Sequence, residues 1–328
     1  MDDKICLYHQ IYQQVYETPF SPIEEIASTL QIPAPEVTQH LDTIYQSFFM
    51  QGPVISVKPA PNYRMYSYFL QVENPYAQYK QPFKRSYISK SWTAGAWNLM
   101  VITDEKVDFT GMEGVKECVH SGKKGGTYIS KCVHTNWDHS MKDIFSRMEA
   151  PGEETVFYEE VPSFNRGQKE WLLYHAFRMN VRQDPTPILR KLDIDQETYK
   201  KWISSLPSAA FIQPAFYPHG WDTYSARDFL LSSNHQRQVV DILGLLPCSG
   251  IFFSAGDFLL ARLFMKGPEE SKRVDTIILH MRKCGYITDF QTSLVLATCH
   301  TGDSQNLTLG IDDRKTAEIG AHSPSSPQ

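Results

Sequence analysis

The sequence predicts an α+β protein made of two similar halves, each with a helical segment followed by a segment that mixes strands and helices. The main observation is an ordered repeat whose offset stays between 160 and 166 residues. The matched segments are 30–32 with 192–194, 69–74 with 229–234, 93–99 with 254–260, and 134–135 with 300–301. A period this long predicts a tandem duplication of whole domains rather than a solenoid. Fused halves form a pseudo-dimer, whose site can be asymmetric.

Composition is ordinary for a globular protein. The 328 residues are 41% apolar and 21% charged, which leaves room for several domains. No stretch approaches the roughly 18 apolar residues of a membrane helix, and the start of the chain is unlike a secretory signal. The six cysteines form no CxxC pair, a pattern that suits reduced thiols. We therefore expect a cytoplasmic protein without membrane contact.

Charge is distributed unevenly along the chain. The net charge is −5, and residues 1–60 hold seven acidic side chains against two lysines. Residues 166–224 hold eight basic side chains against six acidic ones. If either segment contacts DNA, the second is electrostatically better suited.

The first half begins with a helical pattern. Apolar spacing over 3–18 predicts an amphipathic helix, and two further helices, one from about 23 and one over 34–50, are separated by the turn at 30–33. This order is typical of a helix-turn-helix. Strand patterns over 54–58 and 63–68 around a proline-rich turn predict a β-hairpin wing.

The same order returns in the second half. Helices are predicted over 168–181, 187–192 and 196–206, followed by a second wing from 210. The next elements are predicted as strand 228–233, helix 235–246, hairpin strands 250–254 and 258–265, helix 271–284 and strand 291–299. This β-α-β-β-α-β order is ferredoxin-like. The first α/β segment is less regular, because Pro75 and Pro82 interrupt its first crossover helix.

The predicted fold is therefore two winged helix-turn-helix domains, each followed by a ferredoxin-like domain. The boundaries are 1–68 and 164–224 for the winged domains, 69–140 and 225–301 for the α/β domains, 141–163 for a solvated acidic connector, and 302–328 for a polar, disordered tail.

This order of elements resembles the Lrp/AsnC (feast/famine) transcriptional regulators. The closest stretch is 240–297, where 246–260 looks like that family's effector-domain hairpin with its Gly-Asp turn and 285–296 looks like its closing strand. The family normally has one unit per chain and dimerises through its α/β domains. Here two units are fused, and the first turn, Gly95-Ala96, lacks the acid.

The resemblance implies a small effector bound where the two α/β domains meet. The implied ligand-binding residues are Thr93, Gly95, Trp97, Thr127, Gly256, Asp257, Thr292 and Ser293. Glycine permits a tight turn whose backbone N–H groups can face a carboxylate. The alternative is that these glycines only form hairpins.

Aromatic and basic side chains alternate over 76–97 in the first half. Such a mixture could line a pocket for an aromatic or acidic metabolite, and it could equally form an aromatic core with a basic rim.

A doubled Cys-x-His pattern offers a weak metal alternative. Its members are Cys118, His120, Cys132 and His134. Thiolate and imidazole suit Zn²⁺, but the spacing matches no common zinc module, and ordinary packing is the preferred interpretation. No cofactor is expected.

Polar side chains on the two predicted recognition helices are the candidates for DNA contact. They are Gln39 and His40 in the first helix, and Gln196, Thr198, Lys200 and Lys201 in the second. The alternative is that one or both helical units are vestigial scaffolds.

Two functions are the main alternatives, and a scaffold or interaction protein with a vestigial regulator fold is a third. The first is a ligand-responsive DNA-binding transcriptional regulator of the Lrp/AsnC type, and two such chains could associate further. The second is an enzyme with vestigial helix-turn-helix domains, because the siroheme decarboxylases have a similar two-domain architecture and work as paired units. No stretch matches that enzyme family's active-site pattern.

Overall fold

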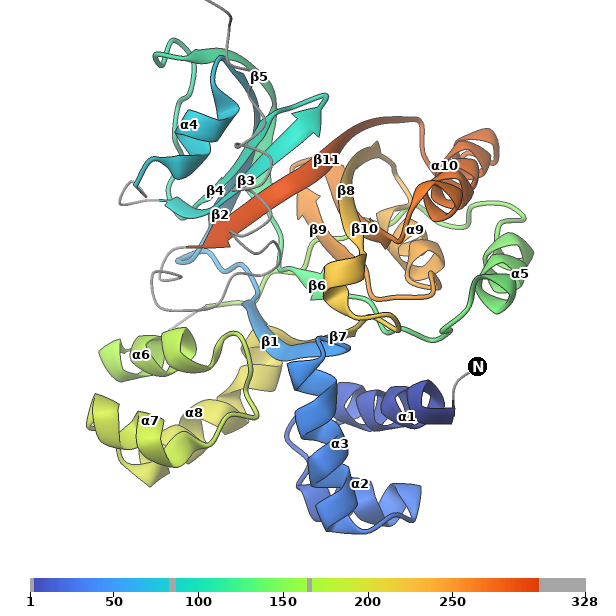
Figure 1. Cartoon of the computed structure of the whole chain (residues 1–328). Helices are drawn as coiled ribbons and strands as arrows, with labels where there is room; N and C mark the ends of the chain where they lie inside the picture. The colour runs from blue at the N-terminus through green and yellow to red at the C-terminus, as the bar shows by residue number, and fades with distance from the viewer. Residues whose placement is uncertain (1–2, 83–86, 164–166, 301–328) are drawn as a thin grey trace, which may run out of the picture.

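The chain has an α+β structure with a closed sheet at one end and two helical units at the other (Figure 1). The computed structural model describes residues 3–82, 87–163 and 167–300. The predicted disordered tail, 302–328, lies outside the described residues.

Each helical unit contains three helices at the predicted places. The first unit comprises α1 (Asp3–Glu17), α2 (Ile23–Leu30) and α3 (Ala34–Gln46). The second comprises α6 (Gln168–Phe177), α7 (Pro185–Leu192) and α8 (Gln196–Ala209). Their apolar faces meet in two separate cores, which contain Ile11 and Leu41 in the first unit and Leu173 and Trp202 in the second.

The turn between the second and third helix is the same in both units. Gln31 and Asp193 are left-handed, with φ of 57° and 53°. After each of them an amide N–H returns to the preceding helix, Ile32 to the Ala27 carbonyl and Ile194 to the Leu189 carbonyl, both at 3.1 Å. The repeated segments 30–32 and 192–194 therefore form the same turn in both halves.

The predicted wing hairpins are wrong. Strand β1 (Met50–Val57) pairs antiparallel with β7 (Ala210–Phe216) of the other half, not with the strand that follows it. The physical reason is that β2 (Met65–Val72) is occupied on both edges by other strands of the closed sheet. The β1–β7 pair also exchanges core residues, since Ile55 packs among α6–α8 and Phe216 packs among α1–α3.

The second α/β unit has the predicted order of elements. It comprises β8 (Ser225–Ser232), α9 (Gln236–Leu243), β9 (Ile251–Ala255), β10 (Phe258–Met265), α10 (Pro268–Lys283) and β11 (Asp289–His300), with the short 3-10 helix η1 (Trp221–Thr223) before it. Its strands pair in the order β11–β8–β10–β9. Helices α9 and α10 cover its outer face and enclose the core that contains Val240 and Ile278 (Figure 1).

The first α/β unit pairs its strands in the same order but has fewer helices. After β2 come α4 (Pro75–Lys80), β3 (Tyr87–Gly95), β4 (Leu99–Thr103) and β5 (Val115–Lys124), and the pairing order is β5–β2–β4–β3. Pro75 lies at the first turn of α4, where proline is tolerated, and Asn74 caps that helix. Residues 104–114 contain no helix where the second half has α10.

The two units join edge to edge into one closed barrel. Strand β11 pairs with β3, and β5 meets β9 at Lys124 and Ala255. The sheet has nine strands, and all except β6 (Tyr128–Ile129) form the ring, which the β9–β10 pairing closes. The fourth strand of each unit therefore pairs with the second strand of the other.

The connector between the halves is packed against both of them. Helix α5 (Trp137–Arg147) places Ile144 in the core of the second α/β unit. Farther along, Glu159 pairs with Lys58 at 2.6 Å. Glu149, Glu153 and Glu154 are exposed, in keeping with the predicted solvated face.

Among the described ranges, no helix combines the length and the apolar character that crossing a lipid bilayer requires.

Closure of the barrel predicts that Gly122→Ala destabilises the protein. A Cβ at Gly122 would lie 2.5 Å from the Gly256 backbone nitrogen, so the β5–β9 junction would have to open. We expect a loss of about 1–3 kcal/mol, measured by urea denaturation. Gly152→Ala is the control, because there the Cβ meets only the flexible end of Gln238. Equal stability of the two variants would show that the junction does not constrain the fold.

Candidate functional site

Five of the eight predicted ligand residues meet at the β3–β11 seam. Gly95 pairs with Ser293, and the Ser293 hydroxyl donates to the Trp97 carbonyl at 2.9 Å while accepting the Trp97 N–H at 3.1 Å. The Thr93 hydroxyl donates to the same carbonyl at 2.9 Å. Thr292 accepts the Ala96 N–H on its carbonyl and donates its hydroxyl to the Asp228 carbonyl. These groups bond to one another and fasten the two halves together.

The other three predicted residues lie at or near the β5–β9 seam. The Gly256 N–H donates to the Lys123 carbonyl at 2.8 Å, and the Asp257 carbonyl accepts from Gln236. Thr127 follows β5, and its N–H donates to the Ser56 hydroxyl of β1 at 2.7 Å. The predicted set is therefore divided between two seams, which occupy equivalent places in the pseudo-symmetric barrel.

Glycine is required at both seams because the backbones approach closely. A Cβ at Gly95 would lie 2.5 Å from the Thr292 carbonyl oxygen. Gly256 has a φ of +62°, which favours glycine at the β9–β10 turn. These contacts support the alternative that the glycines shape hairpins and junctions.

The aromatic side chains over 76–97 do not line a single pocket. Trp97 is fully buried inside the barrel against Phe69. Tyr76 of α4 instead packs on Trp92 outside the barrel, with 5.1 Å between the ring centroids. Lys90 is also buried there, and its ammonium donates to the Gln78 and Gln81 carbonyls at the end of α4. Residues 83–86 of this stretch lie outside the described residues.

The doubled Cys-x-His pattern does not form a metal site in the described residues. His120 on β5 bonds to the Ala255 carbonyl at 2.7 Å, whereas His134 pairs with Asp143 at 2.9 Å. Cys132 is buried against α1, where its N–H donates to the Tyr12 hydroxyl. No group of three or more potential ligands comes together in that part of the chain.

The predicted DNA-contacting side chains lie on helix surfaces of opposite electrostatic character. On α3, Gln39 is exposed and His40 lies 3.5 Å from Glu36. Helices α2 and α3 contain no lysine or arginine between Ile23 and Gln46.

Helix α8 exposes Gln196, Lys200 and Lys201, although Lys201 pairs with Glu197 at 2.6 Å. Thr198 is tied to the helix cap, since its N–H donates to Asp195 at 2.7 Å. The Thr198 backbone N–H is therefore used in capping the start of α8.

A buried polar cluster lies inside the barrel, and sequence reasoning missed it. Asp228 on β8 is fully buried and accepts from Arg262 on β10 at 2.7 and 2.9 Å. Arg262 also donates to Thr298 at 3.2 Å and to Ser91 at 3.3 Å. A bidentate, hydrogen-bonded pair of this kind is the form in which buried charges are tolerated.

Two titratable groups lie at the same end of the barrel. Burial lowers the pKa of Lys124 to about 7. Burial, followed by the charges of Arg178, Arg262 and Lys124, lowers the pKa of His300 to about 3. The sequence signal for this cluster was the charged residues Asp228 and Arg262 at inward-facing strand positions, where apolar residues are expected.

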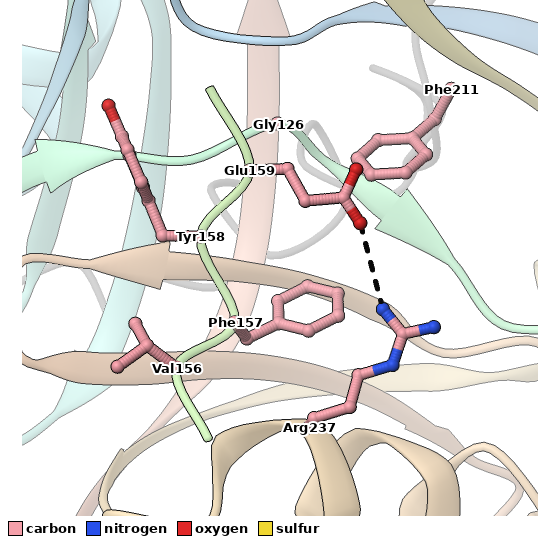
Figure 2. A pocket seen from close by; sticks show the side chains of 7 residues that line it. All are labelled: Gly126, Val156, Phe157, Tyr158, Glu159, Phe211 and Arg237. Carbon is pink, nitrogen blue, oxygen red and sulfur yellow. Dashed lines mark ion pairs between the residues drawn. The ribbon is translucent and has the colours of Figure 1, made fainter. Parts of the chain in front are cut away.

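A small surface hollow lies on the outside of the barrel, lined in part by the connector. Figure 2 shows it between Phe157, Phe211 and the ion pair of Glu159 with Arg237, whose charged atoms are 3.8 Å apart. Its lining combines the apolar side chains of Val156, Phe157 and Phe211 with the charged Glu159 and Arg237. None of the predicted ligand residues lines it.

Two solved structures are distantly similar to this chain. The crystal structure of the siroheme decarboxylase NirDL aligns with 89% of this chain and 91% of its own, at 10% identity and a TM-score of 0.49. The same enzyme in co-complex with an iron-uroporphyrin III analogue aligns with 84% of this chain and 86% of its own, at 9% identity and a TM-score of 0.43. No family model and no curated protein matches. Similarity this low assigns neither a family nor an activity.

The buried pair predicts a large effect of Asp228→Asn. The variant leaves the Arg262 charge without its counter-ion, so we expect a loss of about 3–5 kcal/mol in the free energy of unfolding. Glu197→Gln removes the same charge from an exposed pair and should cost about 0.5 kcal/mol or less. Chemical denaturation of both variants tests this, and equal losses would contradict it.

The burial of Lys124 predicts that Lys124→Met has a larger free energy of unfolding than the wild type, by an amount that depends on pH. The folded pKa of about 7 lies below the ordinary 10.5, so the unfolded chain binds more protons between these values. Wild-type stability therefore rises with pH across this window. The advantage of the variant should be largest near pH 6 and shrink by pH 10, as followed by urea denaturation. A difference independent of pH would mean that Lys124 is not a buried titrating amine.

Proposed function

We propose that the protein is a ligand-responsive, DNA-binding regulator in which two helix-turn-helix units, joined by the β1–β7 pair in place of separate wings, are fixed relative to one another within one chain. The observation that carries the proposal is the pair of equivalent turns at Gln31 and Asp193, each followed by an exposed third helix. The β1–β7 pair holds the two units together in the way that a dimer interface holds two protomers. In this proposal the α/β units correspond to the ferredoxin-like effector domains.

Charge assigns the main DNA contact to the second unit. Helices α7 and α8 expose Arg190, Lys191, Lys200 and Lys201, whereas the exposed charges of α2 and α3 are acidic. Phosphate contacts dominate DNA affinity, so the first unit would be repelled from a duplex that the second unit binds. A regulator of this design reads one half-site and not a palindrome.

A second candidate function is enzymatic, with helical units that serve as scaffolds. It is favoured by the buried Lys124, whose amine donates to the Gly125 carbonyl and the Thr127 hydroxyl. Burial lowers the pKa of Lys124 to about 7, which suits proton transfer at neutral pH. A tetrapyrrole retained by the purified protein, visible as colour, would favour this function over DNA binding.

The regulator predicts that Lys200→Ala/Lys201→Ala weakens DNA binding. With a labelled duplex from the region upstream of its own gene, the wild type should bind in a salt-dependent manner. Loss of two phosphate contacts should reduce the slope of log affinity against log salt by about 1–2. Fluorescence anisotropy over a salt series measures this slope.

The matched control is Glu36→Gln/Asp42→Asn on α3, which removes acidic charge from the other unit. Its affinity should equal or exceed that of the wild type. Absence of wild-type binding at low salt would rule out the regulator.

A further inference from the structure

The barrel end next to the helical units holds the buried amine of Lys124, beside which the described residues place no carboxylate. Lys124 is 4% exposed, and its ammonium donates to the Gly125 carbonyl and the Thr127 hydroxyl, both at 2.8 Å. It also lies over the Phe253 ring, 4.4 Å from the centroid. In the described ranges no carboxylate pairs with it, and an ammonium has three N–H donors. One N–H therefore remains for another acceptor.

The barrel fold itself does not require this charge. At the β5–β9 seam Lys124 is opposite Ala255, and at the other seam the equivalent strand β11 places Val295 opposite Thr93. An apolar side chain thus closes the barrel at the corresponding place. A buried unpaired cation costs free energy, so its presence on one side only indicates a role outside closure.

The Arg262–Asp228 pair shows the same asymmetry. In the first half the corresponding register positions on β2 and β4 hold Ser67 and Ile102. Ser67 is fully buried, and its hydroxyl has no hydrogen-bond partner. On β2 it is two residues from Met65, which pairs with Lys124. An orphan hydroxyl therefore faces the same interior as the unpaired ammonium.

Positive charge surrounds this interior. Arg178, Arg262 and Lys124 each lie within electrostatic range of His300, because burial first and then these three charges lower the pKa of His300. Asp228 neutralises Arg262, and the Arg262 side chain retains 13% exposure, so solvent reaches the cluster. Among the described residues no carboxylate balances Lys124, and a bound anion would supply that charge.

We propose that the barrel end formed by Lys124, Arg262, His300 and Ser67 binds a small oxyanion, a carboxylate or a phosphate group, which supplies the counter-charge that Lys124 lacks. The group is small because Met65 and Phe253 fill the adjoining interior. This site differs from the Gly-turn seams that the sequence resemblance implied.

The oxyanion would connect the barrel to the DNA-facing helices. Arg178 ends α6, and its carbonyl accepts the Ile55 N–H of β1 at 2.8 Å. An anion drawn toward Arg178 would bias the placement of the second helical unit. This effector role rests on the proposed regulator function, whereas oxyanion binding itself does not.

The test measures oxyanion binding without DNA. Isothermal titration calorimetry of the full chain with succinate, with inorganic phosphate and with chloride at matched ionic strength should show binding of at least one oxyanion and none of chloride. The succinate and phosphate titrations distinguish a carboxylate from a phosphate ligand. Lys124→Met should weaken binding about tenfold or more, because it removes the unpaired charge.

The matched control is Lys123→Met, which removes a neighbouring exposed lysine of the same strand and should leave affinity unchanged. Lys124→Met is expected to be at least as stable as the wild type, so lost binding does not reflect unfolding. Absence of wild-type binding up to about 10 mM, or equal losses in both variants, would overturn the proposal. Neither result depends on whether the protein binds DNA.

Discussion

Closure of one barrel from two halves of the chain is the constraint on which the rest of the structure depends. The fourth strand of each α/β unit completes the sheet of the other, so neither unit has a finished sheet alone. The junctions need backbones in close approach, which is why Gly95, Gly122 and Gly256 lie there. Because the barrel fixes both units, it also fixes the β1–β7 pair and the two sets of helices beyond it.

The equivalent positions at which the two halves carry different residues are the most informative about function. Equivalent register positions hold Asp228 and Arg262 in one half but Ser67 and Ile102 in the other. The acidic and basic helix surfaces differ in the same way between α3 and α8. A homodimer must repeat every charge, whereas a fused pair can place a cation such as Lys124 once. Under the proposed function, this freedom would allow a single asymmetric site to act on a single DNA-facing helix.

Local patterns predicted the helices of the two helical units and the order of the second α/β unit, because amphipathic spacing, caps and turns are encoded by neighbouring residues. They did not predict α5, which lies across the start of the predicted connector. The wing hairpins failed because β1 finds its partner in β7, a long-range pairing that no local pattern records. The predicted ligand residues include Gly95 and Gly256, which the structure places in close-packed seams, and their role in binding stays a prediction. The polar cluster was missed because Asp228 meets Arg262 only when β8 and β10 pair, and Lys124 meets Ala255 only when the barrel closes.

The central claim is that both seams belong to one closed, cooperative barrel. Native-state hydrogen exchange tests it most directly, at the Ala96 N–H of the first seam and the Gly256 N–H of the second, which donate to the Thr292 and Lys123 carbonyls. The account predicts that both amides exchange slowly and through the same opening event. Rapid exchange at Gly256 while Ala96 stays protected would contradict closure and leave an open sheet with two loosely associated halves.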